Sequence, residues 1–137
     1  MIAYVTVGAD DLVAARRFWD AVLLPLGCRV ETGPEGLSYV LPMGEGERAQ
    51  LDLYVKPTFD GRPASAGNGA MVALEAARQA QVRALHAAGV AAGGTDEGAP
   101  GFRAAYGPRF YVGYLRDPQG NKVALFSSDP AEPGRDG

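Results

Sequence analysis

The feature that most constrains the fold is one pattern of elements that occurs in both halves of the chain. Tyr4-Val-Thr-Val7 and Met71-Val-Ala-Leu74 share the same alternation of side chains. At the same offset, Phe18 falls on Leu85. Each half is expected to contain a strand, a helix and then further strands, so the repeated unit is βαβββ. A repeat of this length favours duplication, although two unrelated amphipathic β–α units can share such a pattern.

The first half is expected to begin with a β-branched and aromatic strand over residues 2–7. Asp10 then suits the N-cap position of a helix, and Pro25 and Gly27 suit its end. The apolar residues between them recur at helical spacing, so one face of this helix is expected to be buried. Three strands are expected over residues 28–32, 37–41 and 50–55, with a turn at 33–36 and a loop at 42–47.

The second half is expected to follow a linker over residues 57–69, which is rich in Pro, Gly and Ser. A strand over 70–74 and an alanine-rich helix over 76–88 come next, and this helix has no Ser, Thr or Asp cap. Residues 93–103 are expected to form a loop with at most one short strand. The last nine residues, 129–137, are almost without apolar side chains and are expected to be a flexible tail.

A turn motif near the C-terminus predicts a hairpin. Arg116-Asp-Pro-Gln-Gly-Asn121 separates two patterned segments, 110–115 and 122–126. Asp117 at the first corner, Pro118 at the second and Gly120 at the fourth are the residues that a type I turn prefers. The two segments are therefore predicted to pair as antiparallel strands that close the domain.

Composition excludes several classes of function. The chain has 137 residues, a net charge of −3 and a pI of about 5.1, and no cluster of basic residues, so one domain and no nucleic-acid partner are expected. Cys28 is the only cysteine, so no internal disulfide is possible. The N-terminal residues lack the pattern of a signal peptide, and no apolar stretch approaches the ~20 residues of a membrane span. A cytoplasmic protein without a membrane partner is therefore expected.

Segments along nearly the whole chain match one known family in order and spacing. They are Ile2–Val7, Asp10–Leu12, Arg17–Trp19, Gly67–Leu74, His86–Gly94, Ala99–Arg103 and Arg116–Asn121. In these segments the chain resembles the vicinal oxygen chelate superfamily of glyoxalase I, bleomycin resistance proteins and ring-cleaving dioxygenases. The resemblance implies an α+β fold in which two βαβββ modules, 1–56 and 70–128, form a curved mixed sheet around a cavity. It also implies a homodimer. A ferredoxin-like dimeric barrel is disfavoured, because its βαββαβ unit places fewer strands after the first helix.

The resemblance also identifies four strand positions at which metal-dependent relatives carry their ligands. In this chain the positions hold Tyr4, Asp52, Met71 and Ala124. Alanine cannot bind a metal and a phenol binds one weakly unless it is ionised, so no catalytic metal and no other cofactor are expected. A facial site of two histidines and a carboxylate is excluded in any case, because His86 is the only histidine. His86 is expected to be a solvated residue near the end of the second helix.

Strand alternation predicts which side chains line the cavity. The resemblance adds Tyr106 and Tyr111, on the segment that rims the pocket in the family. The predicted ligand-binding residues are therefore Tyr4, Thr6, Asp52, Tyr54, Met71, Tyr106, Tyr111, Ala124 and Phe126. An aromatic cavity with one carboxylate suits a flat or cationic organic ligand. Alternatively, the tyrosines serve ordinary sheet packing and Asp52 is an exposed charge on an edge strand.

Other candidate groups are three arginines and the cysteine. Arg103, Arg109 and Arg116 are candidates for an anion site, although Arg116 is more simply expected to brace the hairpin turn. Cys28 has no neighbouring base in the sequence, so it is expected to be a small buried hydrophobic residue rather than a nucleophile.

Two functions from different classes follow. The first is a metal-free protein of the bleomycin-resistance kind that binds a small organic molecule. The second is a lyase or dioxygenase-type enzyme with altered chemistry, in which Tyr4 or Tyr106 acts as acid–base and Asp52 as base. A third possibility is a degenerate copy whose only role is dimerisation.

Overall fold

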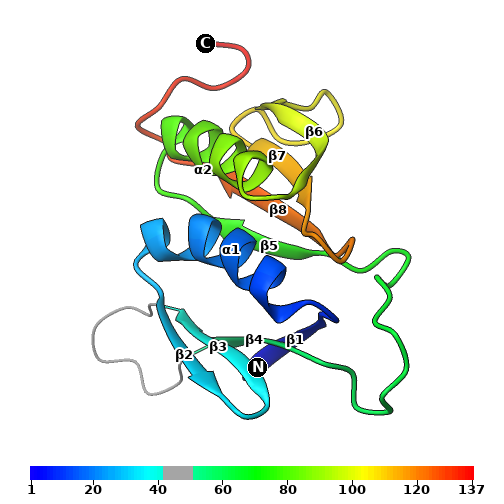
Figure 1. Ribbon diagram of the computed structural model, residues 1–137. Coiled ribbons are helices and arrows are strands. Elements are labelled where there is room, and N and C mark those ends of the chain that lie inside the picture. Colours follow the sequence, from blue (N-terminus) through cyan, green and yellow to red (C-terminus); the bar gives the residue numbers. More distant parts are fainter. Residues whose placement is uncertain (42–50) are drawn as a thin grey trace.

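The computed structural model of the chain describes residues 1–41 and 51–137, which form two modules with the same order of elements (Figure 1). The first module contains β1 (Tyr4–Gly8), α1 (Leu12–Leu23), a 3₁₀ turn (Leu24–Leu26), β2 (Arg29–Gly33), β3 (Gly36–Leu41) and β4 (Leu51–Lys56). The second contains β5 (Val72–Glu75), α2 (Gln79–Ala91), β6 (Thr95–Phe102), β7 (Tyr111–Arg116) and β8 (Lys122–Ser127). The predicted loop at 42–47 and Gln50, the first residue of the strand predicted over 50–55, lie outside the described residues.

The two sheets have equivalent topologies. Their strand orders are β1-β4-β3-β2 and β5-β8-β7-β6. In each sheet the first strand pairs in parallel with the last, and the other neighbours pair antiparallel. The predicted α+β fold of two βαβββ modules is therefore confirmed in the described part of the chain, and the ferredoxin-like alternative is wrong.

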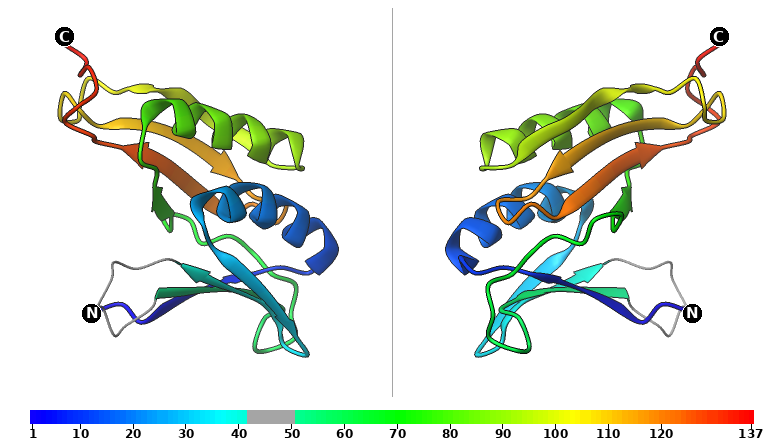
Figure 2. Two further views of the ribbon diagram at one scale, coloured as in Figure 1. Left: turned by 90° about the vertical axis from the view of Figure 1, so that its left-hand side faces the viewer. Right: turned by 90° about the vertical axis from the view of Figure 1, so that its right-hand side faces the viewer.

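The helices lie on one face of each sheet and contact each other. α1 packs against β3 and β4, and α2 packs against β6, β7 and β8 (Figures 1 and 2). The helix-facing side chains of both sheets belong to one apolar core, whose largest fully buried members include Trp19, Tyr39, Phe18, Leu53, Leu115 and Leu125. The core therefore joins the modules, and the opposite face of each sheet is free of helices.

The predicted hairpin turn is present, and it also holds the two modules together. Gly120 has φ +97°, and its N–H donates to the Asp117 carbonyl at 2.9 Å, as the turn requires. Asp117 is only 2% exposed, and its Oδ2 accepts a hydrogen bond at 3.1 Å from the indole Nε1 of Trp19 in α1. Asn121 Nδ2 donates to the Gly8 carbonyl at 3.0 Å, which ties the same turn to the end of β1.

The N-cap of the first helix lies one residue later than predicted. Asp11, not Asp10, is the N-cap, and its Oδ1 accepts from the Ala14 N–H at 3.0 Å. Asp10 instead accepts from the Ala64 N–H at 2.9 Å, a contact with the linker that local sequence does not reveal. The end of the helical segment at Gly27, with φ +91°, is as predicted.

The second helix obtains its N-terminal cap from the end of the chain. It begins at Gln79, after Arg78, which makes no capping hydrogen bond through its side chain. The Gln79 N–H donates to Glu132 Oε2 at 2.7 Å, so a carboxylate distant in sequence satisfies one of the free donors at this helix terminus. Residues 129–137, expected to be a flexible tail, thus make polar contacts with the second module.

In the second module one strand is longer than predicted, and one residue is more buried than predicted. Residues 95–102 form the eight-residue strand β6, where a loop with at most one short strand is expected, because pairing with β7, with two register shifts, overrides its Gly- and Pro-rich sequence. His86 is 9% exposed rather than solvated, and its Nε2 lies 3.1 Å from both Asp96 Oδ1 and the Tyr114 carbonyl. Because both partners are acceptors, Nε2 carries the proton and joins α2 to β6 and β7.

Cys28 is buried, as predicted, and 6% exposed. Burial raises the pKa of its thiol to about 11, so the group stays neutral at physiological pH.

Neither described helix is long and apolar enough to cross a membrane.

Candidate functional site

Neither described helix covers the second face of its sheet, and most of the predicted cavity residues lie on or near these two faces. Cross-strand partners share a face, so the register defines each surface. On the first sheet the surface, which we call face A, includes Tyr4, Thr6, Ser38, Asp52 and Tyr54. On the second sheet the surface, which we call face B, includes Ala73, Val112, Tyr114, Ala124 and Phe126.

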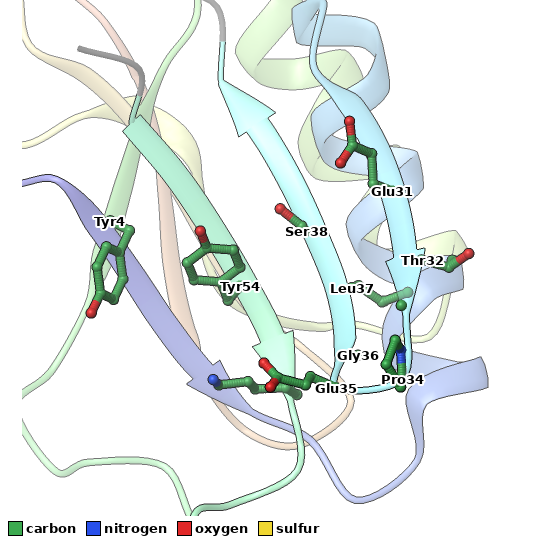
Figure 3. Close-up of a pocket in the computed structure, with 11 residues that line it drawn as sticks. Tyr4, Glu31, Thr32, Pro34, Glu35, Gly36, Leu37, Ser38 and Tyr54 are labelled. Atoms are coloured by element: carbon green, nitrogen blue, oxygen red, sulfur yellow. The ribbon is translucent and has the colours of Figure 1, made fainter.

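Face A carries a hollow of about 560 Å³ lined by Tyr4, Tyr54, Lys56 and the turn between β2 and β3 (Figure 3). The rings of Tyr4 and Tyr54 meet edge to face, with centroids 5.3 Å apart. Lys56 Nζ lies 5.9 Å from the centroid of the Tyr54 ring. Tyr4 is 60% exposed, so its ring presents an open aromatic surface.

Asp52 lies beside these tyrosines and has an unused acceptor. Its Oδ2 accepts from the Tyr54 hydroxyl at 3.3 Å. Its Oδ1 is buried and has no hydrogen-bond partner among the described residues. Desolvation and the Asp52 charge raise the pKa of Tyr54, so this phenol keeps its proton and donates to the carboxylate. A buried acceptor without a donor is uncommon, so Asp52 Oδ1 lacks the partner that such an atom usually has.

Face B carries a second hollow, also of about 560 Å³. Its lining residues are Asn68, Gly69, Ala70, Met71, Glu97, Gly98, Arg103, Tyr106, Tyr114, Arg116 and Lys122. Two cations lie over the Tyr114 ring: Arg103 Cζ is 5.5 Å and Lys122 Nζ is 5.0 Å from its centroid. Desolvation and a hydrogen bond with Tyr106 raise the pKa of Tyr114, so its phenol is neutral at physiological pH.

A row of aromatic rings continues from this hollow along face B. Tyr106 meets Phe110 edge to face at 5.3 Å between centroids, and Phe110 stacks on Phe126 at 5.2 Å. Tyr106, at 49% exposed, is the open end of the row. The loop after β6 thus supplies aromatic surface that the strands alone do not provide.

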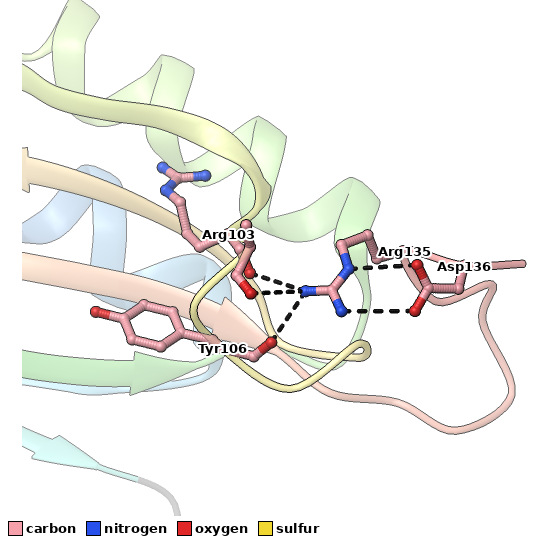
Figure 4. Close-up of polar contacts among 5 residues, drawn as sticks. Arg103, Tyr106, Arg135 and Asp136 are labelled. Atoms are coloured by element: carbon pink, nitrogen blue, oxygen red, sulfur yellow. Dashed lines mark hydrogen bonds and ion pairs between the residues drawn. The ribbon is translucent and has the colours of Figure 1, made fainter.

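The C-terminal residues hold this loop in place (Figure 4). Arg135 Nη1 donates to the carbonyls of Arg103 at 3.1 Å, Ala104 at 3.4 Å and Tyr106 at 3.0 Å. Asp136 in turn accepts from the same guanidinium at 3.4 and 3.5 Å. Arg135 therefore positions the backbone that carries both Arg103 and Tyr106.

The structure distributes the predicted cavity residues over separate places. Tyr4, Thr6, Asp52 and Tyr54 lie on face A, whereas Met71, Tyr106, Ala124 and Phe126 lie on or near face B, and Tyr111 lies in the core. Thr6 lines a smaller hollow of about 270 Å³ with Met71, where β1 approaches the segment that precedes β5.

Tyr111 does not share face B with the other predicted residues. It is 8% exposed in the apolar core, where its hydroxyl accepts from Arg83 Nη1 at 3.2 Å. Sequence reasoning missed Tyr114, which pairs with Ala124 across the hairpin. Counting outward from the turn would have found it, because paired residues point to the same face.

The three candidate arginines have different surroundings. Arg116 braces the turn, as expected: it donates to the Gly120 carbonyl at 3.0 Å and forms an ion pair with Glu97 at 3.0 Å. Arg109 donates to the Glu132 carbonyl at 2.6 Å, in the C-terminal segment. Of the three, Arg103 and Arg116 line the hollow of face B and Arg109 does not.

The four positions that hold metal ligands in metal-dependent relatives lie on separate faces of this chain. Tyr4 and Asp52 are cross-strand partners on face A, whereas Ala124 lies on face B and Met71 just before β5. Together they offer one carboxylate, one phenol and one thioether, a donor set that does not suit a divalent cation. In the described ranges, no three His, Cys, Asp or Glu side chains gather where they could hold one ion.

Comparisons with known proteins find relatives among solved structures. A glyoxalase/bleomycin resistance protein from Albidiferax ferrireducens T118 is 34% identical and has a TM-score of 0.78, over 94% of this chain and 99% of the other. A glyoxalase-related enzyme from Fulvimarina pelagi is 21% identical, with a TM-score of 0.65 over 97% and 91% of the two chains. A glyoxalase/bleomycin resistance protein/dioxygenase family enzyme from Burkholderia phytofirmans PsJN is 19% identical, with a TM-score of 0.64 over 93% and 98%. No family model and no curated protein matches the chain.

Proposed function

The chain belongs to the glyoxalase/bleomycin resistance protein/dioxygenase superfamily, and on this basis we propose that it binds a small organic molecule against its aromatic sheet faces without a catalytic metal. The observation that carries the proposal is the placement of Tyr4 and Tyr106. Both are large side chains left about half exposed or more, and each lines a hollow on a sheet face that no helix covers.

The size and lining of the hollows support this proposal. Each has a volume of about 560 Å³, which is within the range of pockets that hold small organic ligands. Exposed aromatic rings with edge-to-face neighbours, such as Tyr4 beside Tyr54, offer flat surfaces for stacking. Exposed aromatic patches of this kind commonly mark a binding surface.

The cavity requires a homodimer in this proposal. Tyr4 and Tyr106 line separate hollows in one chain, so a single chain does not enclose a ligand between them. A second copy that places its face A against face B of the first encloses both sets of rings.

Ligand-detected ¹⁹F NMR with three probes tests the binding function. The probes are 4-fluorobenzamide, 4-fluorobenzoate and 4-fluorobenzylammonium, which share a ring and differ in charge. We expect at least one of them to bind the chelator-treated protein and to lose affinity in Tyr4→Ala or Tyr106→Ala. Val13→Ala, on an exposed surface of α1, is the control. If no probe binds, or if binding is the same in all variants, the proposal is wrong.

A second candidate function is a lyase that uses acid–base chemistry, and the Asp52 site is the observation that favours it. The Asp52 carboxylate accepts from Tyr54, and its buried Oδ1 has no partner among the described residues, so a carboxylate oxygen is left without a donor beside a phenol. Exchange of solvent deuterium next to the carbonyl of dihydroxyacetone, after exhaustive chelation, tests this function. Exchange that disappears in Asp52→Asn supports it, and exchange equal to a protein-free sample contradicts it.

A further inference from the structure

We propose that face B binds the carboxylate of a flat aromatic acid, with Arg103 and Lys122 as the cations that recognise it. This inference rests on the proposed binding function and adds the charge of the ligand. The Tyr114 ring, whose centroid is 5.5 Å from Arg103 Cζ and 5.0 Å from Lys122 Nζ, is the surface beside which the aromatic part of the ligand lies.

The hollow on face B is positively charged in a protein that is acidic as a whole. Three cations, Arg103, Arg116 and Lys122, line it with a single carboxylate, Glu97, whereas the chain has a net charge of −3. Arg116 and Glu97 neutralise each other at 3.0 Å. The charge that is left belongs to Arg103 and Lys122. A hollow lined by one sign of charge attracts ligands of the opposite sign.

Neither of these two cations is neutralised by a carboxylate in the described part of the chain. Arg103 Nη2 donates to the Ala99 carbonyl at 2.7 Å, which fixes the guanidinium without cancelling its charge. Lys122 makes no hydrogen bond to another described residue through Nζ, and its contact there is with the Tyr114 ring. Both groups therefore retain donors for an anion.

The backbone around Tyr114 is shaped so that these groups can converge. Gly98 is its partner on β6, and a Cβ at Gly98 would lie 2.9 Å from Tyr114 Cδ2 and 3.3 Å from Arg103 Nη2. Ala124, its partner on β8, has only a methyl group. Small residues on both sides thus leave room for the ring and for Arg103 to approach it.

The neighbouring phenols do not oppose an anion. The pKa of Tyr114 is raised by desolvation and by its hydrogen bond with Tyr106, so Tyr114 remains neutral as the pH rises through the physiological range. The site therefore keeps its positive charge. Tyr106, half exposed at the rim, provides a second ring for an aromatic ligand.

An alternative role for the two cations is to meet Glu31 and Glu35 of a partner subunit, and the test separates the two roles. Affinity for 4-fluorobenzoate and for its neutral counterpart 4-fluorobenzamide is measured by ¹⁹F NMR, in the wild type and in Arg103→Met and Lys122→Met. Arg62→Met, which removes an arginine exposed in the linker, is the matched control. Sedimentation velocity on the same samples reports the oligomeric state, and circular dichroism reports the fold.

We expect benzoate to bind about tenfold or more tightly than benzamide, and each of the two site variants to lower benzoate affinity by about five- to tenfold. Benzamide affinity should stay unchanged in these variants, and Arg62→Met should match the wild type. Equal affinity for the two probes overturns the inference and leaves the proposed function intact, whereas failure of every probe overturns both. Variants that dissociate the dimer but keep full benzoate affinity show that the cations serve the subunit contact, which also overturns it.

Discussion

The hydrogen bond between Trp19 and Asp117 allows the loss in free energy of unfolding to be predicted when it is removed. Both partners are buried and belong to different modules. Trp19 is 0% and Asp117 2% exposed, and the indole Nε1 donates to Oδ2 at 3.1 Å. A hydrogen bond to a charged group contributes about 1.5–3 kcal/mol, and leaving a buried carboxylate short of one donor costs a similar amount. Trp19→Phe also replaces a buried ring by a smaller one, at about 1 kcal/mol. The expected loss is therefore about 2.5–4 kcal/mol.

Tyr39→Phe is the matched control, since it also removes one hydrogen bond from a fully buried aromatic residue. The Tyr39 hydroxyl donates to Asp20 Oδ1 at 2.8 Å, but the Asp20 side chain is 27% exposed, so water can replace the lost donor. A loss of about 1 kcal/mol is expected. Urea unfolding, followed by far-ultraviolet circular dichroism at one protein concentration, measures both variants. If Trp19→Phe loses less than about 1 kcal/mol, or no more than the control, the junction between the modules does not rest on this bond.

Three further predictions concern Asp52, Arg135 and Cys28. Asp52→Asn should weaken binding of 4-fluorobenzylammonium several-fold in ¹⁹F NMR because it removes the carboxylate that accepts from Tyr54 on face A; equal affinity in both proteins would exclude this role. Arg135→Ala should speed hydrogen exchange in residues 103–106 and lower benzoate affinity a few-fold, with circular dichroism unchanged; unchanged exchange would show that the loop does not depend on Arg135. The pKa of Cys28 is raised from 9.0 to about 11, so its contribution to stability is present below pH 9 and lost as the pH rises from about 9 to about 11. In urea unfolding, the free energy of unfolding of Cys28→Ala should accordingly fall less over that pH interval than that of the wild type. An equal fall in both proteins would contradict this prediction.

The fold was predictable because its strongest signals are local and occur twice. The helical spacing around Phe18, the stop at Gly27 and the turn at Asp117–Gly120 each depend on neighbours in sequence. Where the determinants were distant, prediction failed or was incomplete. β6 depends on pairing with β7, and the N-terminus of α2 depends on Glu132.

The candidate site was predictable only in part, for a geometrical reason. Alternation correctly grouped Tyr4 with Thr6 and Asp52 with Tyr54, because it needs only the order of residues within one strand. It does not say whether the faces of two sheets meet within one chain, and here they carry separate hollows. Tyr111 was expected at the rim from the family resemblance, but it lies on the core face, and Tyr114 of the same strand lies on face B.

Native mass spectrometry of the protein purified without added metal tests whether a dimer binds an organic ligand without a metal, because it reports subunits, metal and organic ligand together. We expect a dimer without a bound transition metal that takes up 4-fluorobenzoate in preference to 4-fluorobenzamide. One equivalent of a transition metal per subunit that survives dialysis would contradict it, because the donor set at Tyr4, Asp52, Met71 and Ala124 gives no account of such binding.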